Sequence, residues 1–418
     1  MRVCLEMANV MQCFEGRFMA KSRNKKPGMN LREILPLAGI TVAAFIFSSS
    51  EFMPVALLTD IARSFAVTDA QAGMIISVYA WVVMILSLPL MILASRIEFK
   101  RLLLLVMAVF ALGQFLSSIA ASFSILMASR IVVACAHAIF WSIAPPLAVR
   151  VVSEDHRHMA MGIVVMGESV ALIAGLPIGR VIGLVLGWRM TFAIVAIISV
   201  LILIYLWRVL PTLPASQPFT LKKLPTLLGT KQLRGIYVFI ALIASAYYPC
   251  YSYIEPFLLQ SVGFNEIEVT FVIAGFGLTG VVGSMLFSKF YVRIRLKFLT
   301  VCIASLVAAL FLLSLLQAFG IGVIVMCLIL GMDCAALNVA LQSEIIRYAQ
   351  LDDQAVATSI YSGIFNFGIG SGSAVGGVVV TSLGISSIGL VAGLVGLAAL
   401  AYGLAALLPR LRIARNKA

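Results

Sequence analysis

The sequence predicts an all-α membrane protein in which twelve transmembrane helices form two six-helix, pseudo-symmetric bundles. Composition is the first observation behind this prediction. Of the 418 residues, 62% are apolar and 11% are charged, whereas soluble proteins average about 45 to 50% and about 25%. The mean hydropathy of +1.09 agrees with a chain that lies mostly in a lipid bilayer.

The second observation is a series of apolar segments, each about long enough to cross a bilayer as a helix. A hydrocarbon core of about 30 Å requires roughly 20 helical residues. The twelve predicted spans lie near residues 34 to 58, 72 to 94, 102 to 120, 130 to 149, 160 to 182, 190 to 210, 235 to 257, 268 to 288, 298 to 317, 321 to 343, 355 to 381 and 384 to 407.

The third observation is a weak repeat between the two halves of the chain. The first span ends SEFMPVALL and the seventh ends SYIEPFLL, so each has a glutamate shortly followed by a proline. Two bundles with a site at their interface are typical of transporters whose halves rock about a central cavity. We expect an N-terminal bundle at residues 34–210, a cytoplasmic linker at 211–233 and a C-terminal bundle at 234–407.

The positively charged side chains predict the orientation in the membrane. Most of the 30 Lys and Arg residues fall in alternate connections, and the positive-inside rule then places both termini in the cytoplasm. The net charge of +13 therefore does not indicate a nucleic-acid partner, because that reading requires a basic face on a soluble domain. Four arginines remain for the far side or the membrane interior: Arg63, Arg130, Arg180 and Arg189.

The chain ends and the cysteines carry little functional information. The first thirty residues lack the apolar region and cleavage site of a secretory signal. We expect cytoplasmic tails at residues 1–33 and 408–418, with Met1, Met19 or Met29 as the initiating residue. The seven cysteines lie in the N-terminal tail and in predicted spans, which indicates reduced, small apolar side chains rather than a disulfide framework.

A family resemblance covers nearly all of the chain after about residue 34. The stretches that carry it are AAFIFSSSEFMPVALLTDIA, YAWVVMILSLPLMI, SRIVVACAHAIFWSI, GLPIGRVIGLVLGWRMTF, YSYIEPF and SGIFNFGIGSG. They resemble the twelve-helix drug:proton antiporter branch of the major facilitator superfamily. Within that branch they look like the bacterial sugar efflux transporters, which export arabinose, related sugars and thiogalactosides.

The resemblance implies a proton-coupled sugar exporter that works by alternating access in the inner (cytoplasmic) membrane of a bacterium. Its expected partners are a sugar, protons and the lipid bilayer. We expect a functional monomer with no cofactor and no metal. A multidrug or other small-metabolite:proton antiporter of the same fold is the alternative.

Two family motifs are only partly present. The connection after span two reads MILASRIEFKR, with Ser95 where the family has an aspartate, so a gating role for that aspartate is not transferred. Span five resembles the antiporter motif through Gly175, Pro177 and Gly179. These glycines let helices approach closely, and the proline frees a backbone carbonyl and bends the helix.

Glu51 is the main candidate for proton coupling. A carboxylate within hydrocarbon is costly, and a partly dry cavity favours the protonated acid, so the group can take up a proton on one side and release it on the other. The antiporters that the chain resembles carry an acid at this place. Arg130, at the start of span four, matches the arginine of the family's proton-relay motif and is the expected partner. The alternatives are a cap or snorkelling role for Glu51 and an interfacial anchor for Arg130.

Span four presents a cation, an imidazole and a large aromatic ring on one face. Arg130, His137 and Trp141 are spaced i, i+7 and i+11, within about 20° of one line along a helix. We predict that His137 and Trp141 contact the substrate, with an interhelical hydrogen bond as the alternative for His137. Glu168 in span five and Asp333 in span ten lie near the predicted midplane. Either could couple protons or form an interhelical hydrogen bond.

The predicted sugar contacts come mainly from span seven. Tyr248, Tyr251 and Glu255 recur at helical spacing in SAYYPCYSYIEPF. Tyrosine rings can pack on sugar C–H faces, and hydroxyl and carboxylate groups can pair with sugar hydroxyls. An interfacial aromatic belt is the alternative for the tyrosines. Span eleven adds Asn366 on a polar stripe, beside a seam of small residues that we expect to pack against a neighbouring helix: Gly368, Gly372 and Gly376.

Other functional classes lack their motifs. The sequence contains no His-Glu-x-x-His, no Gly-x-Ser-x-Gly and no P-loop, which argues against a membrane enzyme of these types and against ATP-driven export. A channel or receptor has the same composition, but only a transporter would move its substrate uphill with protons.

Overall fold

The computed structural model describes residues 29–94, 97–213, 224–349 and 354–415. Over these ranges the chain forms helices and connecting segments, with no strand. Twelve helical segments are long and apolar enough to cross a membrane, which confirms the predicted fold class. The tail through residue 28, Ser95 and the central part of the linker lie outside the described residues.

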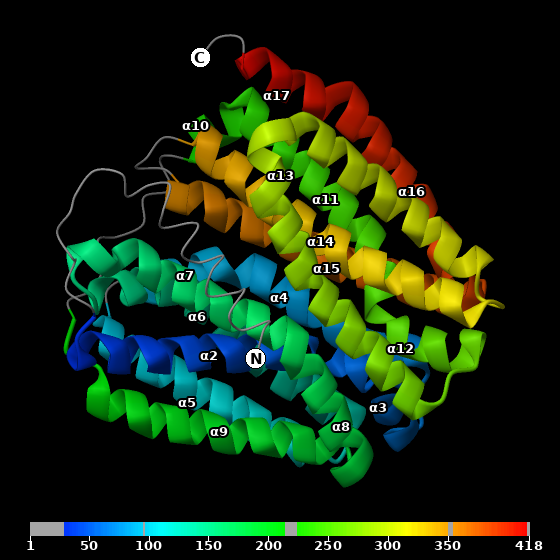
Figure 1. Ribbon diagram of the computed structural model, residues 1–418. Coiled ribbons are helices and arrows are strands. Elements are labelled where there is room, and N and C mark those ends of the chain that lie inside the picture. The colour runs from blue at the N-terminus through cyan, green and yellow to red at the C-terminus, as the bar shows by residue number, and fades with distance from the viewer. Residues whose placement is uncertain (1–28, 95–96, 214–223, 350–353, 416–418) are drawn as a thin grey trace, which may run out of the picture.

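The N-terminal bundle contains the first six spans, drawn in blue to green in Figure 1. Its long helices are α2 (Leu31–Ala56), α4 (Asp69–Ala94), α5 (Phe99–Ser118), α6 (Phe123–Arg150) and α9 (Trp188–Val209). The fifth span consists of α7 (Arg157–Val170), the π-helical turn η2 (Ala171–Gly175) and α8 (Leu176–Leu186). Two short elements complete the bundle: α3 (Leu58–Ser64) and η1 (Glu154–His156).

The C-terminal bundle contains the last six spans. It begins with α10 (Leu224–Gly229), α11 (Lys231–Ser252), α12 (Ile254–Pro256) and the π-helical η4 (Phe257–Val262). Then α13 (Glu266–Leu315) supplies two spans, because the chain bends at Ile294 with φ −130° and ψ 34°. The remaining elements are α14 (Gly320–Tyr348), α15 (Gln354–Ser382), η6 (Ile385–Ser387), α16 (Ile388–Tyr402), η7 (Gly403–Leu407) and α17 (Leu408–Arg415).

Asparagine caps determine where two spans begin. The Asn30 side chain accepts from the Glu33 amide at 3.1 Å, and the Glu33 carboxylate accepts from the Asn30 amide at 3.1 Å. Asn265 and Glu268 form the same pair of bonds at the start of α13, at 3.0 and 2.8 Å. Such capping boxes satisfy amides that have no helical partner. Therefore α2 and α13 start slightly before the apolar segments that predicted them.

The first membrane span of each bundle is broken near its end. Helix α2 contains Pro54 and ends at Ala56, and α3 resumes at Leu58. Helix α11 contains Pro249 and ends at Ser252, and Tyr253 has non-helical angles of φ −114° and ψ 20°. Proline lacks an amide hydrogen and crowds the preceding turn. The predicted span at residues 235 to 257 is therefore shorter, and Glu255 belongs to α12 instead.

The two bundles lie side by side and converge at α3, α8 and α12, as Figure 1 shows. We call this the distal end and the opposite end, near α10, the linker end. Contacts between the bundles run from α4 to α15, from α8 to α13, and from α12 to α2 and α3. The seam predicted on α15 packs against α11, since a Cβ atom at Gly372 would lie 2.9 Å from Tyr248 Cβ.

Close packing of span five on α2 leads to a stability prediction. A Cβ atom at Gly167 would lie 2.6 Å from the Thr41 carbonyl oxygen, whereas one at Gly162, on the same helix, meets nothing within 4 Å. Gly167→Ala should therefore force α7 away from α2 and cost about 1 to 3 kcal/mol. Thermal unfolding of the detergent-solubilised protein should show a lower Tm for Gly167→Ala and an unchanged or slightly raised Tm for Gly162→Ala. Equal effects would contradict the packing.

Candidate functional site

Arg130 is a buried cation that binds the backbone just before Glu51. Its Nη1 atom donates to Ser50 Oγ at 3.1 Å, and its Nη2 atom donates to the Ser50 carbonyl at 2.8 Å. That carbonyl would normally accept from the amide four residues later, but this residue is Pro54, which has no amide hydrogen. The proline in α2 thus frees the acceptor that Arg130 uses. The guanidinium also lies 4.8 Å from the centre of the Tyr79 ring.

Glu51 contacts an imidazole rather than the arginine predicted as its partner. Its Oε2 atom lies 3.6 Å from His137 Nε2, with both side chains largely buried. The ion pairs among the described residues include none between Glu51 and Arg130, because the guanidinium is directed to Ser50. The ring of Tyr79 meets the His137 ring edge-on, with centroids 5.5 Å apart.

Glu168 belongs to the same charged centre. Its charge acts on Glu51 from the fifth span, so two carboxylates and one imidazole come from three helices of the N-terminal bundle. Trp141 lies one turn along α6 from His137, with ring centroids 6.3 Å apart. The structure therefore brings together four of the predicted site residues of this bundle: Glu51, His137, Trp141 and Glu168.

Tyrosines of α11 form the facing wall from the other bundle. The Tyr251 ring lies 5.9 Å from the Phe52 ring of α2, in an edge-to-face arrangement that crosses between the bundles. The ring centroids of Tyr248 and Tyr251 are 5.5 Å apart. The charge of Glu51 acts on both side chains. The predicted aromatic residues of span seven thus face the predicted proton-coupling acid.

Several buried polar atoms in this region have no protein partner. A buried polar group that lacks a hydrogen bond is costly, so these atoms are available to a polar ligand. They are His137 Nδ1, Tyr79 Oη, Ser77 Oγ and Asn366 Oδ1. Asn366 lies on α15, where its amide nitrogen donates to the Ser362 carbonyl at 3.0 Å.

The space beside the tyrosines is small in this conformation. A pocket bounded by Tyr248, Asn338 and Phe365 measures about 20 Å³, whereas typical ligand pockets measure about 300 to 1,000 Å³. All residues that line this pocket belong to the C-terminal bundle, and the pocket is too small to hold a sugar.

Two predicted residues lie elsewhere. Asp333 is buried inside the C-terminal bundle, where it bonds the Ser305 side chain and its Oδ2 atom has no partner. Glu255 lies at the distal end, with its Oε1 atom 3.2 Å from Arg180 Nη1. Within the part of the chain that the structure describes, no hydrogen bond or ion pair joins either residue to the tyrosines of α11.

Sequence reasoning missed two members of the site, Ser50 and Tyr79, and also missed the ion pairs that Arg180 makes at the distal end. Ser50 gave no signal of its own, although the proline four residues later indicates a free carbonyl at that position. Tyr79 begins one of the stretches that carry the family resemblance, but nothing in its span indicated a site residue. Arg180 was recognisable as an arginine inside an apolar segment, but its carboxylate partners are 75 and 86 residues away in the sequence.

Comparisons with known proteins agree with this architecture. The model of the Major Facilitator Superfamily matches residues 40–349 and 237–417. A probable sugar efflux transporter of Helicobacter pylori is 41% identical over 360 residues, covering 86% of this chain and 92% of the relative. A protein of the same description from Mannheimia succiniciproducens is 39% identical over 368 residues, covering 88% and 92%.

Solved structures share the fold at low sequence identity. A bacterial homologue of the human lysosomal transporter Spinster, described as inward-facing and unoccupied, superposes with a TM-score of 0.72 at 18% identity, covering 91% of this chain and 98% of that chain. The human organic anion transporter gives a TM-score of 0.68 at 12% identity, covering 90% and 100%. With the family model matched over both bundles and the relatives aligned over most of the chain, the protein belongs to the Major Facilitator Superfamily.

Proposed function

We propose that the protein exports sugars in exchange for protons. The observation that carries this proposal is the contact between Glu51 and His137, 3.6 Å apart, opposite the tyrosines of the other bundle. A titratable carboxylate beside an imidazole can exchange a proton, and the tyrosines can pack on a sugar. The relatives described as probable sugar efflux transporters support the same substrate class.

Competition between sugar and proton for the Glu51 carboxylate would couple sugar export to proton import. An ionised Glu51 accepts hydrogen bonds from sugar hydroxyls at both oxygen atoms, whereas a protonated Glu51 has fewer acceptor sites and becomes a donor itself. Sugar and proton therefore compete for the same oxygen atoms, as exchange requires.

Charge distribution supports an orientation. Lys and Arg residues gather in the connections at the linker end, so we place that end and both termini in the cytoplasm of a bacterium. The distal end then faces outward and is closed in this structure. We propose that one chain works as a monomer, since each bundle supplies one wall of the site.

Substrate loss from cells distinguishes sugar export from multidrug export. Cells that overproduce the protein should lose accumulated radiolabelled arabinose or thiogalactoside faster than control cells, and their resistance to dyes should stay unchanged. Increased dye resistance without sugar loss would assign the protein to the multidrug class, whose substrates the aromatic wall could also accept.

Replacing the titrating carboxylate should uncouple transport. Glu51→Gln cannot exchange a proton, so export driven by a pH gradient should fall to the level of protein-free vesicles, while sugar binding to the purified protein stays measurable. Asp60→Asn, a change in the nearby α3, should transport normally. A Glu51→Gln variant with the wild-type rate and pH dependence would show that the carboxylate is structural.

The hydrogen-bond geometry of Arg130 predicts that a positive charge at this position is not enough for proton coupling. Lysine keeps the charge but lacks the planar pair of donors that reaches both Ser50 Oγ and the Ser50 carbonyl. Arg130→Lys should therefore displace Glu51 and reduce the protons released per sugar exported. Arg189→Lys, at the distal end, should leave this ratio unchanged. Normal coupling in Arg130→Lys would mean that only the positive charge matters.

The sugar contacts are tested by truncating three side chains from three helices. Trp141→Ala, Tyr251→Ala and Asn366→Ala should each raise the sugar concentration for half-maximal export by about tenfold, a loss of about 1.4 kcal/mol. Phe115→Ala removes an exposed ring from the outer surface of α5 and should have no effect. Unchanged affinity in all three variants would place the sugar elsewhere.

A further inference from the structure

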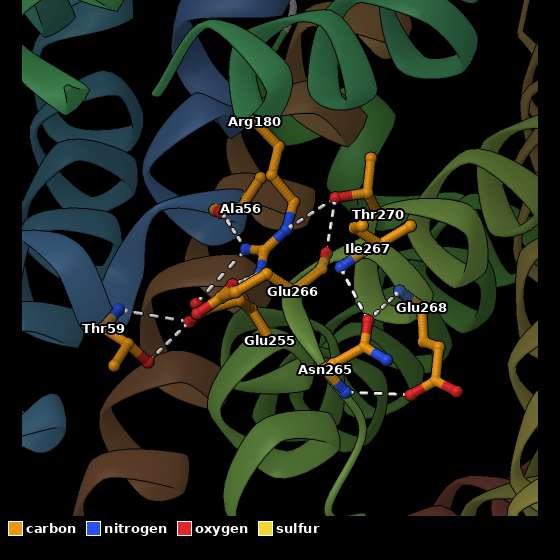
Figure 2. Close-up of polar contacts among 9 residues, drawn as sticks. All are labelled: Ala56, Thr59, Arg180, Glu255, Asn265, Glu266, Ile267, Glu268 and Thr270. Atoms are coloured by element: carbon orange, nitrogen blue, oxygen red, sulfur yellow. Dashed lines mark hydrogen bonds and ion pairs between the residues drawn. The ribbon is translucent and has the colours of Figure 1, made fainter. Parts of the chain in front are cut away.

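Arg180 lies fully buried where the two bundles meet at the distal end. Figure 2 shows its guanidinium at the centre of a polar network. Nη1 donates to the Ala56 carbonyl at 2.6 Å and to Glu255 Oε1 at 3.2 Å. Nη2 donates to the Glu266 carboxylate, and Nε donates to Thr270 Oγ1 at 3.2 Å. One cation therefore binds two carboxylates.

Glu255 is held on its other side as well. Its Oε2 atom accepts from the Thr59 amide at 3.1 Å and from the Thr59 hydroxyl at 2.8 Å (Figure 2). Thr59 and Arg180 belong to the N-terminal bundle, whereas Glu255 and Glu266 belong to the C-terminal bundle. Both ion pairs of Arg180 and both bonds from Thr59 to Glu255 thus cross from one bundle to the other.

Burial makes this network different from a surface ion pair. The side chains of Arg180 and Glu255 are 0% and 1% exposed. A buried ion that loses its partner is left uncompensated, which is strongly unfavourable. When the bundles separate, both ions gain water instead. The buried pair of Arg180 and Glu255 is therefore stable only when both charges are present or when both are exposed to solvent.

We propose that Arg180, Glu255, Glu266 and Thr59 form a latch that closes the distal end and opens once in each transport cycle. We call this set the distal latch. The proposal rests on the alternating-access cycle of the proposed function. It makes Glu255 a positioning residue that controls the conformational step, in place of the sugar contact that its sequence neighbours predicted.

A cavity approaches the distal latch from the outside. Its volume is about 620 Å³, and residues of both bundles line it, including Thr59, Asp69, Gln260 and Thr381. Gln260 donates to Asp69 Oδ2 at 2.6 Å, which adds a further contact between the bundles. Because Thr59 both lines this cavity and holds Glu255, opening of the distal latch would extend the cavity inward between the bundles.

Tyr253 closes the interface beside the latch. Its side chain is fully buried, and its hydroxyl donates to the Ala70 carbonyl at 3.4 Å. A Cβ atom at Gly73 of α4 would collide with its ring, and one at Gly376 of α15 would lie 2.8 Å from it. The ring therefore fits between one helix of each bundle and packs the interface tightly beside the latch.

Distances between spin labels on the two bundles test the distal latch directly. Arg63 and Ser382 are exposed positions at the distal end, one on each bundle, and can carry labels in a variant whose seven native cysteines are replaced. Double electron–electron resonance on the full chain in lipid nanodiscs gives the distribution of distances between the two labels. The short and long distances then give the ratio of open to closed molecules. This ratio requires no transported sugar, so an incorrect substrate assignment would not affect it.

The variants have different expected shifts. Arg180→Ala leaves a buried carboxylate with only Thr59 as its partner and should raise the open-to-closed ratio by about a hundredfold. Glu255→Gln keeps the shape but removes one of the two ion pairs of Arg180, and it should raise the open-to-closed ratio by about tenfold. The double variant removes both charges, so it should lie closer to the wild type than Arg180→Ala does.

Glu268→Gln is the matched control. Glu268 lies in the same first turn of α13 as Glu266, but its carboxylate binds the Asn265 amide of its own bundle (Figure 2). Its ratio should equal that of the wild type. Glu255→Gln carries the test alone if Arg180→Ala does not insert. An unchanged ratio in Glu255→Gln, an equal shift in Glu268→Gln, or a double variant more open than Arg180→Ala would overturn the proposal.

Discussion

Two buried arginines donate to backbone carbonyls that helix α2 leaves without a helical partner. Pro54 frees the carbonyl of Ser50, which Arg130 binds, and the end of α2 frees the carbonyl of Ala56, which Arg180 binds. An unpaired carbonyl away from water costs several kcal/mol. The arginines remove this cost, and each thereby gains a fixed position. Arg130 thereby holds the backbone beside Glu51, and Arg180 holds the centre of the distal latch.

Helix α2 consequently connects the two functional regions. Glu51 follows the residue that Arg130 binds and contacts His137. The carbonyl of Ala56, little more than one turn later, accepts from Arg180 of the distal latch. A change at Glu51 that moves α2 would therefore reach Arg180 through a short, rigid segment. Proton binding and opening of the distal end can be linked in this way by one helix, without a long chain of contacts.

Sequence patterns predicted the architecture well because span length and apolar composition are local properties. They also placed His137 and Trp141 correctly on one face of α6, since that helix is unbroken between them. The prediction for Glu255 assumed that helical spacing continued past Tyr253, but α11 ends at Ser252. The expected pairing of Glu51 with Arg130 considered only charges as partners, and the freed carbonyl of Ser50 is an equally good acceptor.

Sugar flux under an imposed proton gradient tests the central claim most directly. Purified protein is reconstituted into liposomes loaded with radiolabelled arabinose, and pH gradients of either sign are imposed while an ionophore clamps the membrane potential. The account predicts that arabinose moves against its own gradient, that reversing the pH gradient reverses the movement, and that a protonophore abolishes it. Arabinose movement at the same rate with and without a proton gradient would contradict proton-coupled export.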